Sequence, residues 1–119
     1  MLHAEVTEKL EKQINFELYS AYLYLAIANY YEGANLKGFH NWFQVQAKEE
    51  LDHAMLILTY LQNNGEVPKL HSIAAPDRQY SDFQAPLEDA LKHEQSVTAA
   101  IHAIYEAASK QKDFRTVQL

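Results

Sequence analysis

The chain has 119 residues, no cysteine and a formal net charge of −6, and hydrophobic residues make up 48% of it. One domain over residues 1–119 is expected at this length, and with only three glycines and three prolines it should be helical with a sizeable core. The lack of cysteine excludes disulfides and thiolate metal sites, and the acidic charge disfavours nucleic acid and anionic membranes as partners. No apolar run approaches the ~20 residues of a membrane span and no signal peptide is recognisable, so a cytoplasmic protein is expected.

The hydrophobic pattern predicts an all-α fold that begins with two long helices. The first spans about residues 5–32, and its apolar stripe has helical spacing: Leu10, Ile14, Leu18, Ala21, Leu25 and Ala28. Gly33 is expected just past its end, and Asn35 is expected to cap the second helix, about residues 36–63. So short a connection predicts two antiparallel neighbours.

A long crossover is expected next. Residues 65–83 hold two of the prolines and several turn formers. About 19 residues at up to ~3.3 Å each could run back along a whole helix, so the third helix, about residues 83–111, should start at the same end as the second. Residues 116–119 look like the opening of a further helix. Together these elements predict a four-helix bundle of which the chain supplies three long helices.

Each predicted helix carries an ionisable interruption in its apolar stripe. These residues are Glu17 on the first helix, Glu50 with His53 on the second, and Glu94 on the third. Taken singly, each is compatible with a solvated helix face. Burying three unpaired carboxylates, at several kcal/mol each, would rival the ~5–15 kcal/mol stability of a whole domain. If these faces are buried, a cation must neutralise them.

The ligand types favour a divalent transition ion, with iron, manganese and zinc all compatible. Glu50 and His53 project from one face of a helix, and a pair of ions bridged by Glu50 with His53 as the nitrogen ligand is physically sensible. Tyr24 is expected in the core, with its hydroxyl available to a ligand carboxylate.

Several other residues receive ordinary roles. Glu49 is expected at the surface, and Trp42 and Phe43 in the core. The remaining histidines, expected to be surface or satisfied residues, are His3, His40, His71, His93 and His102. Eight tyrosines are many for this length, which favours an oligomer with tyrosine-rich contacts.

Four segments together resemble the prokaryotic non-haem ferritins, and the resemblance covers essentially the whole chain. They are residues 13–24 (QINFELYSAYLY), 46–54 (QAKEELDHA), 64–68 (NGEVP) and 92–95 (KHEQ). By position, the resemblance implies a first iron site at Glu17, Glu50 and His53. Glu50 would bridge to a second iron ion held by Glu94, Glu49 would belong to a third site, and Tyr24 would lie beside the centre. Leu51 stands where bacterioferritins have a haem-ligating methionine, so no haem is implied.

The implied activity is oxidation of Fe(II) by dioxygen or peroxide, with the ferric product stored as mineral inside a 24-subunit shell. Family members continue into a fourth long helix, whereas this chain stops where that helix should begin. Either a longer product forms the shell, or identical chains associate and exchange helices to cover the open side. The alternatives are a ferritin-like metal-binding or assembly module without efficient turnover, and a purely structural three-helix protein.

Overall fold

Three long helices and one short helix form the structure, a computed structural model that describes residues 2–119. They are α1 (Ala4–Gly33), α2 (Lys37–Asn63), α3 (Ala85–Lys110) and α4 (Phe114–Val117), and residues 2–119 contain no strand. The predicted all-α class is confirmed, and each long helix agrees with its predicted bounds to within two residues. Over the same residues, no helix is long and apolar enough to cross a membrane.

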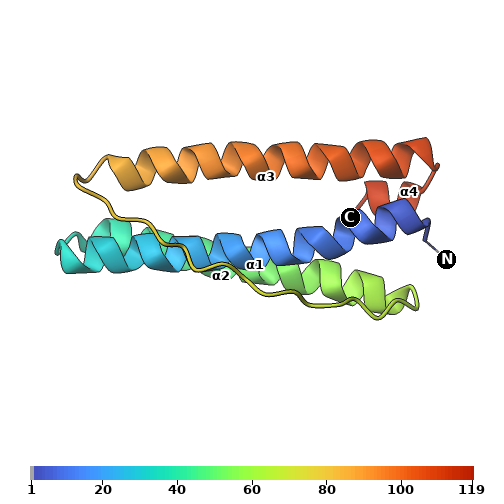
Figure 1. Ribbon diagram of the computed structural model, residues 1–119, viewed down its shortest axis with the longest axis horizontal. Coiled ribbons are helices and arrows are strands. Elements are labelled where there is room, and N and C mark those ends of the chain that lie inside the picture. The colour runs from blue at the N-terminus through green and yellow to red at the C-terminus, as the bar shows by residue number, and fades with distance from the viewer. Residues whose placement is uncertain (1) are drawn as a thin grey trace.

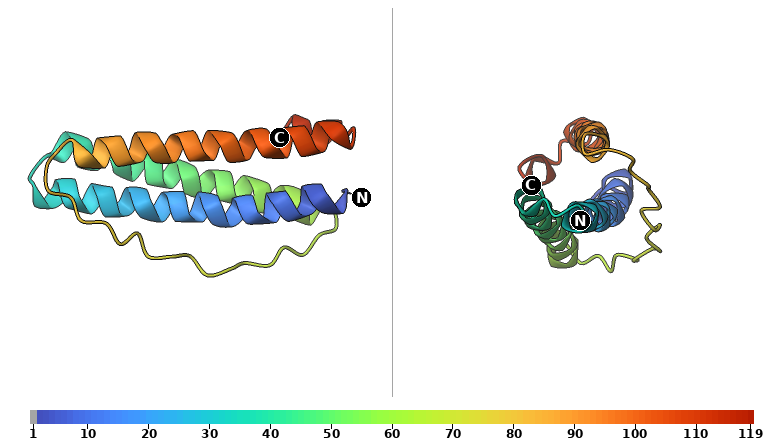
Figure 2. Two further views of the ribbon diagram at one scale, coloured as in Figure 1. Left: turned by 45° about the horizontal axis from the view of Figure 1, so that its top comes forward. Right: turned by 90° about the vertical axis from the view of Figure 1, so that its left-hand side faces the viewer.

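The helices lie along one long axis in a molecule of 49 × 22 × 22 Å. α1 and α2 form an antiparallel pair, and residues 64–84 then run back along its length without regular structure (Figures 1 and 2). α3 therefore starts at the end where α2 starts, and the two run parallel (Figure 1). The expected crossover is confirmed.

Each long helix ends with the same hydrogen-bond pattern. At the end of α1 the backbone N–H of Leu36 donates to the carbonyl of Tyr31 at 2.9 Å, and that of Asn35 donates to Glu32 at 3.0 Å. The pattern needs one residue in the left-handed region, and Asn35 has a φ of 61°. Gly33 is instead the last residue of α1 and Leu36 caps α2, so the expected roles of Gly33 and Asn35 were wrong. Gly65 and Lys112 take the left-handed position after α2 and α3, with φ of 79° and 57°.

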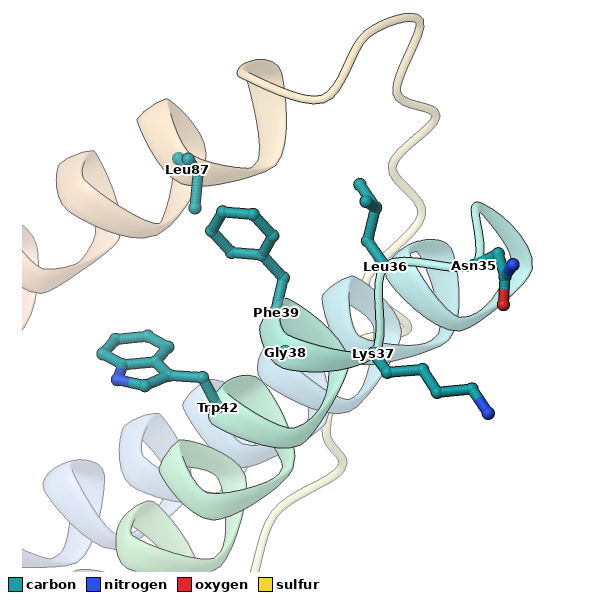
Figure 3. Close-up of a pocket in the computed structure, with 7 residues that line it drawn as sticks. All are labelled: Asn35, Leu36, Lys37, Gly38, Phe39, Trp42 and Leu87. Atoms are coloured by element: carbon teal, nitrogen blue, oxygen red, sulfur yellow. The ribbon is translucent and has the colours of Figure 1, made fainter.

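α3 packs against α1, and within the described residues its Cα atoms lie more than 8 Å from those of α2, so the side between α2 and α3 is more open (Figure 2). A hollow of about 630 Å³ lies at one end of this side, between Phe39 and Trp42 of α2 and Leu87 of α3 (Figure 3). Trp42 is 55% exposed there, so its expected place in the core was wrong, whereas Phe43 is buried as expected. Because no fourth long helix covers this side within residues 2–119, apolar residues such as Phe39 and Leu87 remain in solvent.

The buried interior has two apolar parts with a polar layer between them. One apolar part includes Leu10, Ile14 and Leu61, and the other includes Ile27 and Tyr31. The layer between them contains five buried polar side chains: Gln13, Glu17, Ser20, Glu50 and His93.

The expected apolar stripe of the first helix was right for Leu10, Ile14 and Ala28 but wrong at Leu25. Leu25 is 43% exposed, and α1 instead buries Glu17, Ser20 and Tyr24. Polar side chains thus occupy the middle of the buried face of α1.

Candidate metal centre

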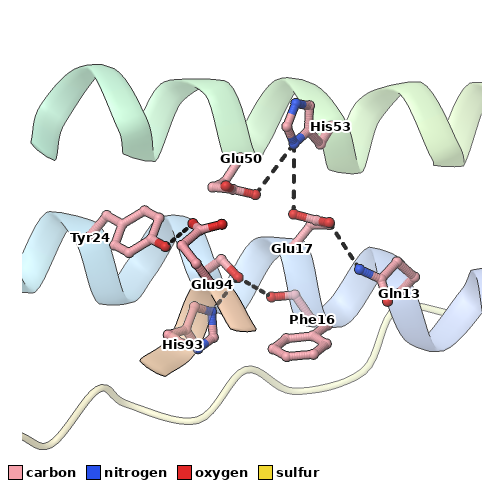
Figure 4. A network of polar contacts seen from close by, with 9 residues as sticks. Gln13, Phe16, Glu17, Tyr24, Glu50, His53, His93 and Glu94 are labelled. Carbon is pink, nitrogen blue, oxygen red and sulfur yellow. Dashed lines mark hydrogen bonds and ion pairs between the residues drawn. The ribbon is translucent and has the colours of Figure 1, made fainter. Parts of the chain in front are cut away.

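Three of the predicted ligands meet in the polar layer. Each of Glu17, Glu50 and His53 offers one ligand atom within 4.8 Å of the other two. Nδ1 of His53 lies 3.4 Å from Oε2 of Glu50 and 3.9 Å from Oε2 of Glu17 (Figure 4). The antiparallel packing of α1 on α2 brings Glu17 to Glu50, and the helical spacing of three residues places His53 beside both.

The sequence interpretation missed a residue that orients this group. Nε2 of Gln13 donates a hydrogen bond of 2.9 Å to Oε1 of Glu17, and both side chains are buried. The signal was present in the chain, because Gln13 precedes Glu17 by four residues and so shares its helix face. The bond uses one carboxylate oxygen of Glu17 and leaves the other directed at His53 (Figure 4).

The two buried carboxylates lack the partners that such groups need. Oε2 of Glu17 and Oε2 of Glu50 are both buried and receive no hydrogen bond. Burial, followed by the neighbouring Glu17 carboxylate, raises the pKa of Glu50 far above its ordinary value. A divalent cation between these oxygens and the imidazole would offset the cost of burying the carboxylates and the repulsion between them. It supplies the positive charge and the coordination that the protein does not. The donor set therefore fits a metal ion.

Glu94 lies beside this group but outside it. The hydroxyl of Tyr24 donates a hydrogen bond to Oε1 of Glu94, and Tyr24 is 2% exposed, which confirms its expected place in the core (Figure 4). Burial, with the Glu94 carboxylate next in effect, raises the pKa of the Tyr24 hydroxyl, so this hydroxyl remains a donor. Glu94 itself is exposed. Of the two possibilities left open for these helix faces, the solvated one applies to Glu94, because no helix within residues 2–119 covers its side of α3.

Glu49 and two of the remaining histidines lie outside the group of Glu17, Glu50 and His53. Glu49 is exposed, as expected, and the structure does not bring it into the group of Glu17, Glu50 and His53. His93 is buried, with its Nε2 2.6 Å from Oγ of Ser20, and burial lowers its pKa. His40 is partly buried, and its Nδ1 lies 2.9 Å from the carbonyl oxygen of Ala28.

The group is reached from the open side of the molecule. His53 has 58% of its side chain exposed, whereas Glu17 and Glu50 are 3% and 8% exposed. A hollow of about 340 Å³ is lined by Gln13, Glu17 and His53 together with apolar residues of all four helices. A small ion can therefore approach His53 from solvent. The larger hollow at Trp42 has only one charged residue in its lining, Lys37, whose side chain points away from it (Figure 3).

Known proteins resemble this chain over nearly its whole length. Residues 7–119 match the family model of the ferritin-like domain. The bacterial non-heme ferritin of Staphylococcus haemolyticus is 36% identical over 117 residues, which cover 98% of this chain and 70% of that protein. Among solved structures, the open pore ferritin of the archaeon Archaeoglobus fulgidus superposes with a TM-score of 0.93 at 40% identity, covering 98% of this chain and 72% of that one. The ferritin of Chlorobium tepidum gives a TM-score of 0.95 at 30% identity, with 99% and 72% coverage. The fold is thus that of the ferritin four-helix bundle, and the chain belongs to the ferritin family.

Proposed function

We propose that the protein oxidises Fe(II) at a carboxylate-bridged pair of iron sites and stores the ferric product. The observation that supports this most directly is the pair of buried, unpartnered carboxylate oxygens of Glu17 and Glu50 facing one imidazole nitrogen of His53. Iron is the substrate and the cargo here. The homology to non-heme ferritins favours iron over the manganese and zinc that the same ligands would accept.

Each ligand has a distinct role in this proposal. Glu17 and His53 hold the first Fe(II), and Glu50 bridges it to the second, because its two oxygens can each face one ion. Glu94 holds the second ion from α3 and is oriented by Tyr24. Glu49, one residue before the bridge, would serve a third, more exposed position. No haem is proposed, since Leu51 offers no ligand atom.

The reaction balances with two irons and one oxidant. Each Fe(II) gives up one electron, and dioxygen takes both electrons with two protons to become hydrogen peroxide. With peroxide as the oxidant, the same two electrons and two protons yield two waters. Anionic ligands stabilise Fe(III) more than Fe(II), because the interaction grows with the charge of the ion. The carboxylates therefore favour oxidation.

The assembly proposed for storage is a shell of identical subunits in the cytoplasm. Its support is the open side of the bundle and the position of α4. Asp113 caps α4 through Thr116, and the hydroxyl of Thr116 lies 2.7 Å from that of Tyr60 on α2. A helix that continued from α4, or a helix from another copy, could lie between α2 and α3 and cover their exposed apolar side chains.

The test is anaerobic addition of Fe(II) followed by oxygen, with the rise of Fe(III)-oxo absorbance as the readout. We expect a rapid rise in the wild type and its loss in Glu50→Ala and His53→Ala. The matched controls are Glu106→Ala and His102→Ala, exposed residues of α3 outside the site, which should behave as the wild type. Equal rates in all five proteins would refute the proposal. Binding of Fe(II) without oxidation would instead favour the metal-binding module.

A further inference from the structure

Only two side-chain hydrogen bonds join α1 to α3 within residues 2–119. One is the bond from Tyr24 to Glu94, and the other joins Ser20 to His93 with Oγ and Nε2 2.6 Å apart. Both Ser20 and His93 are buried, at 0% and 9% exposure. If the helices moved apart, each of these two buried polar groups would lose its partner at a cost in free energy. The pair therefore favours one relative position of the two helices.

The direction of this bond follows from the other contact of the serine. The hydroxyl of Ser20 has a single hydrogen, which it donates to the carbonyl of Phe16 at 3.0 Å. In the tautomer of His93 that carries its hydrogen on Nε2, this nitrogen donates to the oxygen of Ser20, and both hydrogen bonds of the serine are made at once. The ring of His93 is also enclosed by aromatic neighbours, with ring centroids 5.3 Å away for Phe16 and 6.0 Å for Tyr24, both edge to face. One orientation of the imidazole is thereby selected.

The two bonds act on the same turns of the two helices. Ser20 precedes Tyr24 by four residues on α1, and His93 directly precedes Glu94 on α3. No Cα atom of α3 lies within 8 Å of one in α2 in the described chain, so the closer packing on α1 mainly decides how far Glu94 lies from Glu50. Glu94 is exposed, and within residues 2–119 the hydroxyl of Tyr24 is the one hydrogen-bond partner of its carboxylate. A small slide or rotation of α3 would therefore move it away from the bridging carboxylate.

We propose that Ser20 and His93 are positioning residues, which set the place of Glu94 and thereby the affinity of the second metal site. The inference rests on the proposed function, because it assigns Glu94 to the second ion. Neither residue touches the metal. Ser20 and His93 hold the α1–α3 register, and Tyr24 then sets the direction of the Glu94 carboxylate. Loss of the hydrogen bond between Ser20 and His93 should weaken metal binding at Glu94 and leave binding at Glu17, Glu50 and His53 unchanged.

The test is an anaerobic titration with Co(II), followed by its visible spectrum and by calorimetry, which needs no turnover. We expect two Co(II) per wild-type chain. Ser20→Ala should bind the first as the wild type does and the second about tenfold more weakly, the order found when groups that orient metal ligands are removed. His93→Leu should behave as Ser20→Ala, and His93→Gln, whose amide can still donate to Ser20, should recover part of the affinity.

Val97→Ala is the matched control, because it loosens a buried contact of α3 one turn beyond His93 without removing a hydrogen bond. Unchanged binding of both ions by Ser20→Ala overturns the inference and leaves the proposed function intact. An equal loss at both sites, or the same second-site loss in Val97→Ala, also overturns it, since the pair would then only pack the helices. A wild type that binds no Co(II), or only a single ion, contradicts the pair of sites in the proposed function and with it the premise of the positioning role, whereas the three outcomes above concern the positioning role alone.

Discussion

The charge of Glu50 should control the stability of the metal-free protein. Burial and the Glu17 carboxylate raise the pKa of Glu50 from 4.5 to about 9 in the folded chain. The folded state thus holds this proton more tightly than the unfolded state. The tighter binding of this proton contributes fully to the free energy of unfolding below about pH 4.5, and the contribution is lost as the pH rises toward 9. At about 1.4 kcal/mol per pH unit, the loss between about pH 5.5 and 8.5 is about 4 kcal/mol.

Urea unfolding of the metal-free protein at several pH values and constant ionic strength measures this loss. Glu50→Gln keeps the shape of the side chain and removes its titration, so the free energy of unfolding of the variant should exceed that of the wild type by a margin that grows with pH. Glu49→Gln, the exposed neighbour, should follow the wild type. Saturating Zn(II) should remove most of the decrease in the free energy of unfolding that the wild type shows with rising pH, because the cation stabilises the deprotonated carboxylate. Parallel pH profiles for the wild type and Glu50→Gln would refute the reasoning.

Three further predictions concern the fold. Lys112→Gly should raise the free energy of unfolding by about 0.5–1 kcal/mol, because Lys112 has a φ of 57° that glycine adopts without strain; an unchanged urea midpoint would contradict this. Leu61→Ala should lower it by about 2–5 kcal/mol, because Leu61 is fully buried between the helices, and thermal unfolding by circular dichroism checks the change. In the unassembled chain, Trp42, the single tryptophan, is 55% exposed and should show solvent-exposed emission that acrylamide quenches readily. Emission typical of a buried indole would mean that another helix or a second copy covers the open side.

Local rules explain why most of the fold was predictable. Residues 5–32 and 36–63 hold long amphipathic patterns, and Asn64 and Gly65 supply a clear stop. The crossover followed from chain length alone, because a segment of that length can span a helix. The predicted helix ends were wrong where more than one residue could adopt the left-handed conformation. Asn35, rather than Gly33, adopts the left-handed conformation, and asparagine is the non-glycine residue that tolerates it best.

Hydrophobic periodicity misplaced part of the core for a specific reason. The middle of the buried face of α1 consists of Glu17, Ser20 and Tyr24, which score as polar, so the predicted stripe drifted to Leu18 and Leu25. Trp42 was expected in the core, where large aromatic side chains are usually buried. Its exposure depends on which helices are present, and local sequence does not carry that information.

By itself, the sequence determined the ligand types and their helix faces. The spacing of Glu50 and His53 is fixed by helix geometry, and a carboxylate in an apolar stripe signals a cation wherever the stripe is buried. Only the tertiary structure decided that Glu17 joins them while Glu94 stays at the rim, held by Tyr24. It also made Ser20 and His93 a pair, because contacts between residues 73 positions apart depend on how α3 lies against α1. Distances across helices arise from packing, which no local pattern encodes.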